Sequence, residues 1–362
     1  MCVAHRTRSW LPLLLSAGVC ASTLLLPGCA YIAKQAKGQL ELLAGRVAID
    51  EAKKTVEFTT SERELLDWVP RIKDFGEQQV GMSSTKNYTT INPSFTGVIW
   101  NVSAAAPDRF ASHRYHYPVV GALPYIGFWD KEDARAEVKR LGELGWETYM
   151  RRAGAYSTLG WFRDPLWRSM LQWDFERFAN TVLHELAHST LWIPGHGDFN
   201  ESFASFLGDR ATEEFLQSLT AEHPEYWQKH QDDGVDRDQY RRFMHRLVGR
   251  LEGLYGAGLS RAVVAEERAK LIEQARSDYA ALDWRSAGYA RAMRAGRNMG
   301  NARLRQFRVY NTGMDDFDRA LERYGGDLTA FVAAASEELP KARRRGGRGW
   351  DPYAALRELE GS

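Results

Sequence analysis

Cysteine is scarce in this chain, and its few residues are confined to the N-terminal part. Cys2, Cys20 and Cys29 all lie within the first 29 of 362 residues. If a leader is removed before Cys29, one thiol remains and no internal disulfide can form. Because 44% of the residues are hydrophobic, a chain of this length buries enough apolar surface to fold without disulfides.

The sequence also lacks an excess of charge of one sign. It has 48 Lys and Arg against 47 Asp and Glu, which gives a formal net charge of +1. Such a chain has no global field to hold nucleic acid, so we expect no nucleic-acid partner. It contains no internal repeat and no low-complexity segment, which excludes collagen-like and coiled-coil architectures. The composition predicts a globular protein.

The one long apolar stretch is too weakly apolar for a permanent membrane span. It runs from about residue 10 to residue 26, follows Arg6 and Arg8, and is interrupted by small residues. This order is typical of an export signal. The stretch ends in the letters LPGC, which resemble a bacterial lipobox, although Pro27 stands where a small residue is usual.

We therefore interpret residues 1–28 as a lipoprotein signal peptide and Cys29 as the residue that receives lipid. An ordinary secretory signal, with Cys29 incidental, is the alternative. Lipid on Cys29 predicts a periplasm-facing protein of the bacterial cell envelope that binds the membrane through its anchor. Ala30 stands where an inner-membrane retention signal would place Asp, so we expect the outer membrane rather than the inner one. Nothing in the sequence indicates a particular protein partner.

Strand-like segments are concentrated between residues 55 and 162. Four of them are rich in β-branched and aromatic residues and bounded by Gly or Pro: TVEFTT (55–60), TGVIWNVSA (96–104), HYPVVGALPYIGFW (116–129) and AYSTLGWF (155–162). A helix is expected over about residues 131–144. The pattern predicts a sheet-containing lobe over residues 51–172 with a small mixed sheet, preceded by a lipid-proximal helix or linker at 29–50.

From residue 173 onward the sequence predicts almost continuous helix. The expected helices cover about residues 173–191, 199–219, 236–256, 260–281, 285–310 and 314–336. They would form a helical lobe over residues 173–340, so the expected fold class is α+β and predominantly helical. Arginines cluster among glycines in the last segment, and residues 341–362 are predicted to be a basic, solvated tail.

The candidate chemistry lies in the letters HELAH at residues 184–188. On a helix, residues four apart share one face about 5–6 Å apart, so the imidazoles of His184 and His188 turn toward one metal ion. Glu185 then points to the adjoining position, where a general base is needed. These residue types at this spacing are typical of zinc, and one Zn²⁺ per chain is the expected cofactor.

A third ligand is expected from the helix that follows. The chain must reverse between the two helices, so Glu201 is placed beside His188 and completes a site whose fourth position stays open for water. In a competing interpretation Asp198 and Glu201 form a capping box, and Glu201 bonds its own backbone. His196 and Asp198 are rival third ligands, and His196 is otherwise an exposed or substrate-facing loop residue.

Several segments resemble known zinc peptidases. HELAHSTLW followed by NESFASFLG is similar to the gluzincin arrangement, in which a second helix supplies the glutamate ligand. With YPVVGALPYIGFW, AYSTLGWFRDPL and NARLRQFRVY, these segments resemble the bacterial putative aminopeptidase family of zinc lipoproteins, over about residues 39–331. The resemblance implies a gluzincin-like metallopeptidase fold, a peptide substrate, zinc ligands His184, His188 and Glu201, and Glu185 as a catalytic residue.

The peptidase interpretation assigns further roles. Glu185 would take a proton from the attacking water and pass it to the leaving amine. The oxyanion needs a second donor, for which Tyr310 and Tyr156 are candidates, because gluzincins often use a tyrosine distant in sequence. Both tyrosines can instead be core aromatics. The letters VVGALPYIGF, residues 119–128, would offer a sheet edge to an extended peptide or form an ordinary core strand.

The sequence thus predicts a membrane-anchored zinc peptidase, an aminopeptidase by resemblance. A zinc endopeptidase and a non-catalytic envelope scaffold with a structural metal site are the alternatives. An intact Glu185 favours the enzyme, because a structural zinc site needs no general base and closes its fourth position with Cys or His.

The anchor generates a testable change of location. Cys29→Ser removes the thiol that receives lipid, so we expect the variant to lose fatty-acid incorporation and leave the membrane fraction while its soluble domain keeps its activity. Cell fractionation with a labelled fatty acid measures both effects. Equal partition of the two proteins into membranes, with label in neither, would contradict lipidation.

Overall fold

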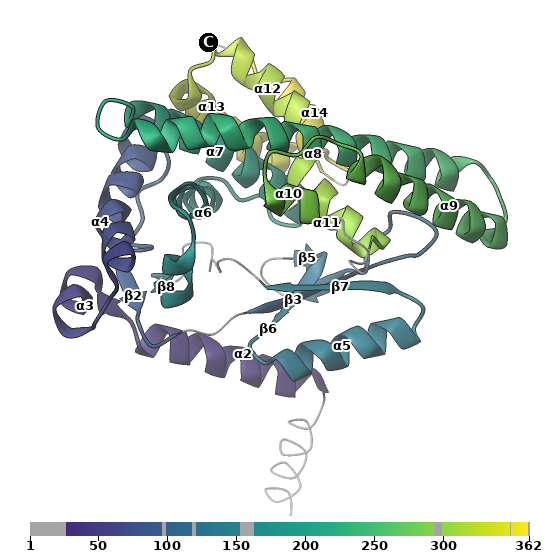
Figure 1. Cartoon of the computed structure of the whole chain (residues 1–362), viewed down its shortest axis with the longest axis horizontal. Coiled ribbons are helices and arrows are strands. Elements are labelled where there is room, and N and C mark those ends of the chain that lie inside the picture. The colour runs from purple at the N-terminus through teal and green to yellow at the C-terminus, as the bar shows by residue number, and fades with distance from the viewer. Residues whose placement is uncertain are drawn as a thin grey trace, which may run out of the picture.

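The computed structural model describes residues 27–95, 99–117, 121–152, 163–292, 299–347 and 349–360. Helices make up most of these residues and lie on both sides of small sheets (Figure 1), which confirms the expected α+β, predominantly helical fold. None of the described helices is long and apolar enough to cross a membrane. The predicted signal peptide lies almost wholly outside the described residues.

The first part of the described chain is mainly helical. Its helices are α2 (Pro27–Ala44), α3 (Ile49–Thr55), α4 (Thr60–Asp74) and the short π-helix η1 (Phe75–Gln79), and the two-residue strand β1 (Val47–Ala48) lies between α2 and α3. Cys29 falls in the first turn of α2. The Tyr31 ring packs edge-on against Phe128 at 5.5 Å between centroids, and its hydroxyl donates to the Gly127 carbonyl at 3.0 Å. α2 is therefore packed directly against the strands.

The strand predicted at residues 55–60 is wrong. Thr55 is the last residue of α3, and Thr59 is the N-cap of α4. The Thr59 hydroxyl accepts a hydrogen bond from the Glu62 amide, and the Glu62 carboxylate accepts one from the Thr59 amide. This capping box satisfies two amides at a helix start, and it outweighs the β-propensity of the segment.

The strands form three small sheets. β1 (Val47–Ala48), β2 (Thr90–Asn92) and β8 (Leu166–Trp167) make a mixed sheet in the order β1-β2-β8. The second sheet is antiparallel with the order β6-β3-β7, from β3 (Trp100–Ala105), β6 (Tyr125–Phe128) and β7 (Glu147–Arg152). β4 (Tyr115–Tyr117) and β5 (Gly121–Leu123) pair as a hairpin. The strand predicted at 155–162 lies outside the described residues.

The helix predicted at residues 131–144 is confirmed as α5 (Lys131–Glu143), which begins at its N-cap Asp130. It covers one face of the antiparallel sheet, where Val102 and Ala104 share a buried cluster with Leu141. The opposite face of that sheet is therefore left for the helical half of the chain.

The C-terminal half is a stack of helices (Figure 1). They are α6 (Phe175–Thr190), α7 (Gly197–Ser218), α8 (Pro224–Gly256), α9 (Arg261–Ala280), α10 (Ala287–Arg291), α11 (Asn301–Asn311), α12 (Met314–Arg323), α13 (Leu328–Arg345) and α14 (Pro352–Arg357). α8 begins at Pro224 instead of about residue 236. The single helices predicted at 285–310 and 314–336 are each divided in two. In the second case Gly325 and Gly326, with φ of 66° and 82°, end α12 before Asp327 caps α13.

The tail predicted at residues 341–362 is wrong as a solvated end. α13 continues to Arg345, and α14 packs against α12 and α13. Leu356 and Leu359 are buried, and the Arg323 guanidinium donates to the carbonyl oxygens of both. The abundance of arginine favoured a solvated tail, but Leu356 of α14 and Leu359, just after that helix, are apolar side chains that pack into the core.

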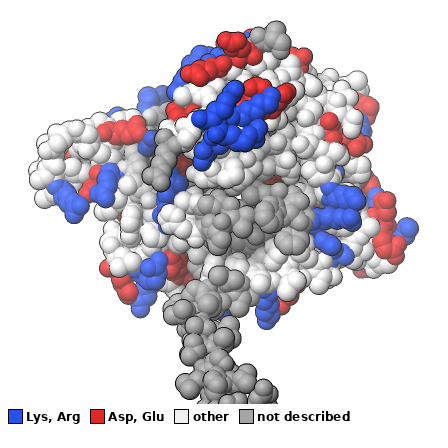
Figure 2. Space-filling view, turned by 180° about the vertical axis from the view of Figure 1, so that it is seen from behind, with Lys and Arg blue, Asp and Glu red and all other residues white. Residues whose placement is uncertain are grey.

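Charged side chains of both signs are spread over the molecular surface. On the face in Figure 2, Lys and Arg gather toward the top with Asp and Glu beside them, and the two signs alternate at both sides. The nearly equal numbers of basic and acidic residues thus correspond, on this face, to side chains of the two signs that lie among one another.

The main core is built around α6 and α7, which pack side by side. Large apolar side chains of both helices are fully or almost fully buried there: Phe178, Val182, Leu183, Leu186, Phe199, Phe203 and Leu207. At Gly208 the two backbones approach so closely that a Cβ would lie 3.1 Å from the Cα of His184. The contact is to backbone, which cannot rotate away as a flexible side chain can.

A bulkier residue at this contact is expected to separate the helices. Gly208→Val should lower the free energy of unfolding by about 1–3 kcal/mol, because overpacking forces backbone shifts. Gly249→Val is the matched control, since Gly249 lies in α8 and a Cβ there would meet no atom within 4 Å. Its stability should change by less than about 0.5 kcal/mol. Equal changes in denaturant unfolding would refute the close contact.

Candidate metal centre

Two histidines of α6 share the face that is turned toward α7. Asp174 caps the helix by accepting from the Arg177 amide, and the apolar side chains of α6 set its rotation against the core. The rings of His184 and His188 then lie 4.8 Å apart between centroids, at 89° to one another. The helical spacing in the sequence thus places two imidazoles beside each other, as expected.

The turn between α6 and α7 is fixed by one buried asparagine. The Asn200 side chain accepts from the Ile193 amide at 2.8 Å and donates to the Ile193 carbonyl at 2.9 Å. This pair of bonds fastens the start of α7 to the segment that leaves α6. The next residue, Glu201, is therefore held at the height of the two histidines.

The glutamate of α7 meets both histidines. Glu201 Oε2 lies 3.7 Å from His184 Nε2 and 3.8 Å from His188 Nε2. The three residues each offer a ligand atom, and these atoms all lie within 4.8 Å of one another. Ligands of a tetrahedral zinc ion, with bonds of about 2.0–2.2 Å, are separated by roughly 3.3–3.5 Å. The distances from Glu201 to the two imidazoles are within a few tenths of an ångström of this value, and the widest separation in the group, up to 4.8 Å, would have to close by roughly 1.4 Å for all three residues to bind one zinc ion.

The capping box considered for Asp198 and Glu201 does not form. α7 begins at Gly197, and its N-cap His196 makes no side-chain capping bond. Asp198 instead pairs with Arg305, and Arg114 lies 3.6 Å from the same carboxylate. Because Glu201 is not used by its own backbone, its carboxylate is available to the site.

The electrostatics of the group favour a charged carboxylate. Burial opposes the charge of Glu201, but the nearby imidazoles of His184 and His188 outweigh it and hold its pKa well below the usual range. Burial lowers the pKa of His188, and Glu201 more than offsets this and raises it. The His188 Nδ1 is buried without a hydrogen-bond partner in the part of the chain that the structure describes.

Tyr125 of β6 was missed by the sequence interpretation. Its hydroxyl donates to Glu201 Oε1 at 3.1 Å, so one carboxylate oxygen is held by tyrosine while the other faces the imidazoles. Burial first and the Glu201 charge second raise the pKa of Tyr125, which keeps it a neutral donor. Such outer contacts orient metal ligands. Its only sequence signal is membership of the strand-like segment 116–129.

Glu185 lies beside the metal group. It is 8% exposed, and its charge is among the causes, after burial, that raise the pKa of both Tyr88 and Tyr310. The same charge acts on His188. A carboxylate surrounded by these groups is placed where the sequence predicts a general base.

Of the two candidate oxyanion donors, Tyr310 lies at the site. It is on α11, and its ring centroid is 6.3 Å from that of His184. Burial and the charge of Glu201 raise its pKa far above the usual range, so the phenol stays protonated as a donor. Arg151 of β7, also missed by the sequence interpretation, donates to the Tyr310 hydroxyl at 3.1 Å. Tyr156 lies outside the described residues.

His196, the rival third ligand, faces elsewhere. Its ring packs edge-on against Trp350 at 5.3 Å between centroids. It lines a cavity of about 220 Å³ with Arg114, Asp198 and Tyr353, next to the start of α7. Burial, Arg343 and Arg114 lower its pKa. Neither His196 nor Asp198 belongs to the ligand group.

The sheet edge predicted to receive a peptide is partly covered. β6 is an edge strand of its sheet, as a peptide-binding strand would be. The Gly127 carbonyl, however, accepts from the Tyr31 hydroxyl and from Gln35 Nε2 at 3.1 Å. α2 therefore occupies this part of the edge, and the nearby Tyr125 serves the metal group instead.

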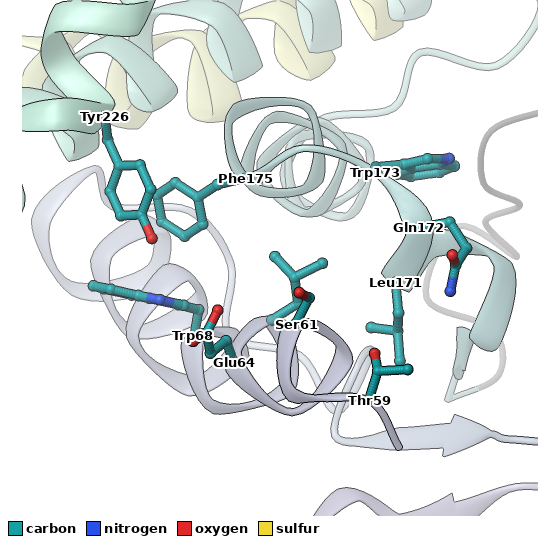
Figure 3. A pocket seen from close by; sticks show the side chains of 10 residues that line it. Thr59, Ser61, Glu64, Trp68, Leu171, Gln172, Trp173, Phe175 and Tyr226 are labelled. Carbon is teal, nitrogen blue, oxygen red and sulfur yellow. The ribbon is translucent and has the colours of Figure 1, made fainter. Parts of the chain in front are cut away.

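A larger cavity of about 470 Å³ lies away from this chemistry, between α4 and the start of α6. Figure 3 shows the rings of Trp68, Phe175 and Tyr226 at one end of it and Gln172 near the other. None of the metal group lines it. The metal-binding chemistry of the α6–α7 group is thus separate from this cavity.

Comparison with known proteins identifies one relationship. A sequence model of a family described as putative aminopeptidase matches residues 30–346. No curated protein and no solved structure matches the chain. The matched range contains every residue of the metal group and both of its tyrosine contacts.

The geometry of the group predicts how zinc binding should respond to substitution. Glu201→Ala should reduce the zinc content of the purified chain from about one to near none, because a ligand is lost. Tyr125→Phe should weaken zinc about 10–100-fold, because the outer hydrogen bond is lost. Metal analysis and chelator competition measure these effects.

The control is Glu214→Ala, which removes an exposed carboxylate from the same helix and should leave zinc content unchanged. Full zinc occupancy in Glu201→Ala would refute its role and return His196 or Asp198 to consideration.

Proposed function

The chain belongs to the putative aminopeptidase family, and from that premise we propose that it is a zinc-dependent peptidase. The observation that carries the proposal is the convergence of His184, His188 and Glu201 with Glu185 one residue along the same helix. Two neutral imidazoles and one carboxylate are the donor set of catalytic zinc sites that keep a position open for water.

Bound by these three residues, zinc would supply a water that is acidic near neutral pH and a Lewis acid for the substrate carbonyl. Glu185 accepts a proton from the attacking water and delivers it to the departing amine. Tyr310 donates its hydroxyl hydrogen to the oxygen on which negative charge develops. Tyr125 holds Glu201 in place throughout, because its bond goes to the oxygen that does not face the imidazoles.

Two features favour an enzyme over an envelope scaffold with a structural metal. A scaffold has no need of a carboxylate at Glu185, and it would close the fourth position with Cys or His. A protonated tyrosine beside the ligands also suits transition-state stabilisation better than structural support. The description of the family favours aminopeptidase over endopeptidase action.

We also propose that the enzyme is anchored in the bacterial envelope by lipid on Cys29, in the outer membrane and facing the periplasm. α2 begins two residues before Cys29 and packs on the sheet that supplies Tyr125. An anchor attached there would hold the catalytic domain close to the membrane with little intervening linker.

Glu185→Gln is the direct test of the proposed chemistry. The amide keeps the size of the side chain but accepts no proton, so zinc content should be unchanged while kcat on short peptides falls by about 10²–10⁴-fold. Glu214→Gln, the exposed substitution on α7, should retain wild-type turnover. Hydrolysis by Glu185→Gln at the wild-type rate would refute the role of Glu185 as general base.

A further inference from the structure

An arginine with a buried Nε lies beside the metal group, and the described residues leave part of its hydrogen-bonding capacity unused. Arg151 donates from one terminal nitrogen to the Tyr310 hydroxyl. Its Nε has no hydrogen-bond partner among the described residues. Because the Tyr310 ring lies 6.3 Å from the His184 ring between centroids, a small molecule that touches the metal group can also reach this guanidinium.

Arg151 differs from other half-buried arginines of the described chain. Arg305 pairs with Asp198, and Arg268 Nη1 lies 2.8 Å from Glu147 Oε1. Within the described ranges Arg151 forms no ion pair, and the carboxylate whose charge reaches it is Glu201, which is already shared by two histidines. A half-buried cation whose Nε is shielded from water and which has no anionic partner costs free energy, and an anionic ligand lowers that cost.

The guanidinium stays charged and faces the site. Burial opposes its charge, yet Tyr310, Tyr125 and Glu201 together raise the pKa of Arg151. Arg151 pairs with Asn101 of β3 and Tyr125 pairs with Ser103, two residues along the same strand. Both side chains therefore lie on one face of the sheet, the face opposite α5.

We propose that Arg151 is the receptor for a substrate carboxylate, so that the enzyme acts on short peptides whose free carboxylate lies one or two residues from the bond cleaved. This inference rests on the proposed peptidase function. A planar guanidinium matches a carboxylate with two parallel hydrogen bonds, which Lys cannot do. With zinc bound, Arg151 and the metal together outweigh the charges of Glu185 and Glu201, so the site as a whole attracts an anion.

The first experiment compares three substrates of the purified, zinc-loaded, full-length chain: alanyl-alanine, alanyl-alaninamide and alanyl-glutamic acid α-amide. The free acid should exceed the alaninamide in kcat/KM by at least about tenfold, since a hydrogen bond to a charged group is lost in the amide. Preference for the glutamic acid derivative over the alaninamide would show that a side-chain carboxylate also reaches the receptor. Equal rates on all three substrates would overturn the proposal.

Variants assign the preference to one residue. Arg151→Gln should bring the ratio of kcat/KM on the acid to kcat/KM on the amide toward one. Arg151→Lys should give an intermediate ratio, because it keeps the positive charge but not the planar pair of hydrogen-bond donors. Arg152→Gln is the matched control: Arg152 is the next residue of β7, exposed and directed over Trp100 on the other face. Its ratio should equal that of the wild type.

A binding measurement separates the receptor from the metal and from catalysis. By calorimetry, N-acetylalanine should bind the zinc-loaded wild type and Arg152→Gln at least about tenfold more tightly than it binds Arg151→Gln. N-acetylalaninamide should show no such difference. A carboxylate held by the metal alone would bind all three proteins equally, and that result would overturn the proposal.

The remaining outcomes distinguish the two proposals. If the wild type hydrolyses no peptide but N-acetylalanine binding depends on Arg151, the peptidase proposal fails and the carboxylate receptor stands. If Arg151→Gln lowers kcat equally on acid and amide, Arg151 acts only by positioning Tyr310, and the receptor is refuted. If thermal unfolding shows that Arg151→Gln is not folded, Arg151→Lys replaces it in the test. The ratio of kcat/KM on the free acid to that on the amide is then compared between Arg151→Lys and the wild type.

Discussion

The close packing of α6 against α7 is the contact on which the rest of the molecule depends. Both helices bury most of their apolar side chains in one core, and the backbones touch at Gly208 and His184. Asn200 then fastens the turn by two buried hydrogen bonds to Ile193. Since these groups are far from water, their bonds are specific in geometry and costly to leave unmade. The position of Glu201 beside the histidines follows from this arrangement.

The antiparallel sheet adds the polar surroundings of the group. Tyr125 and Arg151 project from strands on either side of β3, while α5 covers the other face of the sheet. α11 brings Tyr310 to the same place and is joined to α7 by the Ser202 hydroxyl, which donates to the Val309 carbonyl at 2.7 Å. The candidate site is therefore assembled from the α6–α7 pair, the antiparallel sheet and α11. A shift of any one of these changes the distances around the ligands.

Buried charge is the main energetic burden of this site. Glu201 is 7% exposed, and it is stabilised only because two imidazoles and a tyrosine hydroxyl surround it. Asp198, one turn earlier on α7, is stabilised differently, by Arg305 and Arg114. These arginines explain why Asp198 does not form a capping box with Glu201. Ion pairs between distant segments compete here with a local motif, and a short stretch of sequence does not reveal that competition.

The sequence by itself determined the helical content, the zinc-type spacing on α6 and the residue that joins it from α7. These features depend on periodicity and on separations of a few residues, which short-range physics controls. Only the tertiary structure decided that residues 55–60 join two helices and that Leu356 and Leu359 of the last segment are buried. It also brought Tyr125, Arg151 and Tyr310 to the ligands, because strand register and helix packing join positions more than 70 residues apart. No local pattern carries that information.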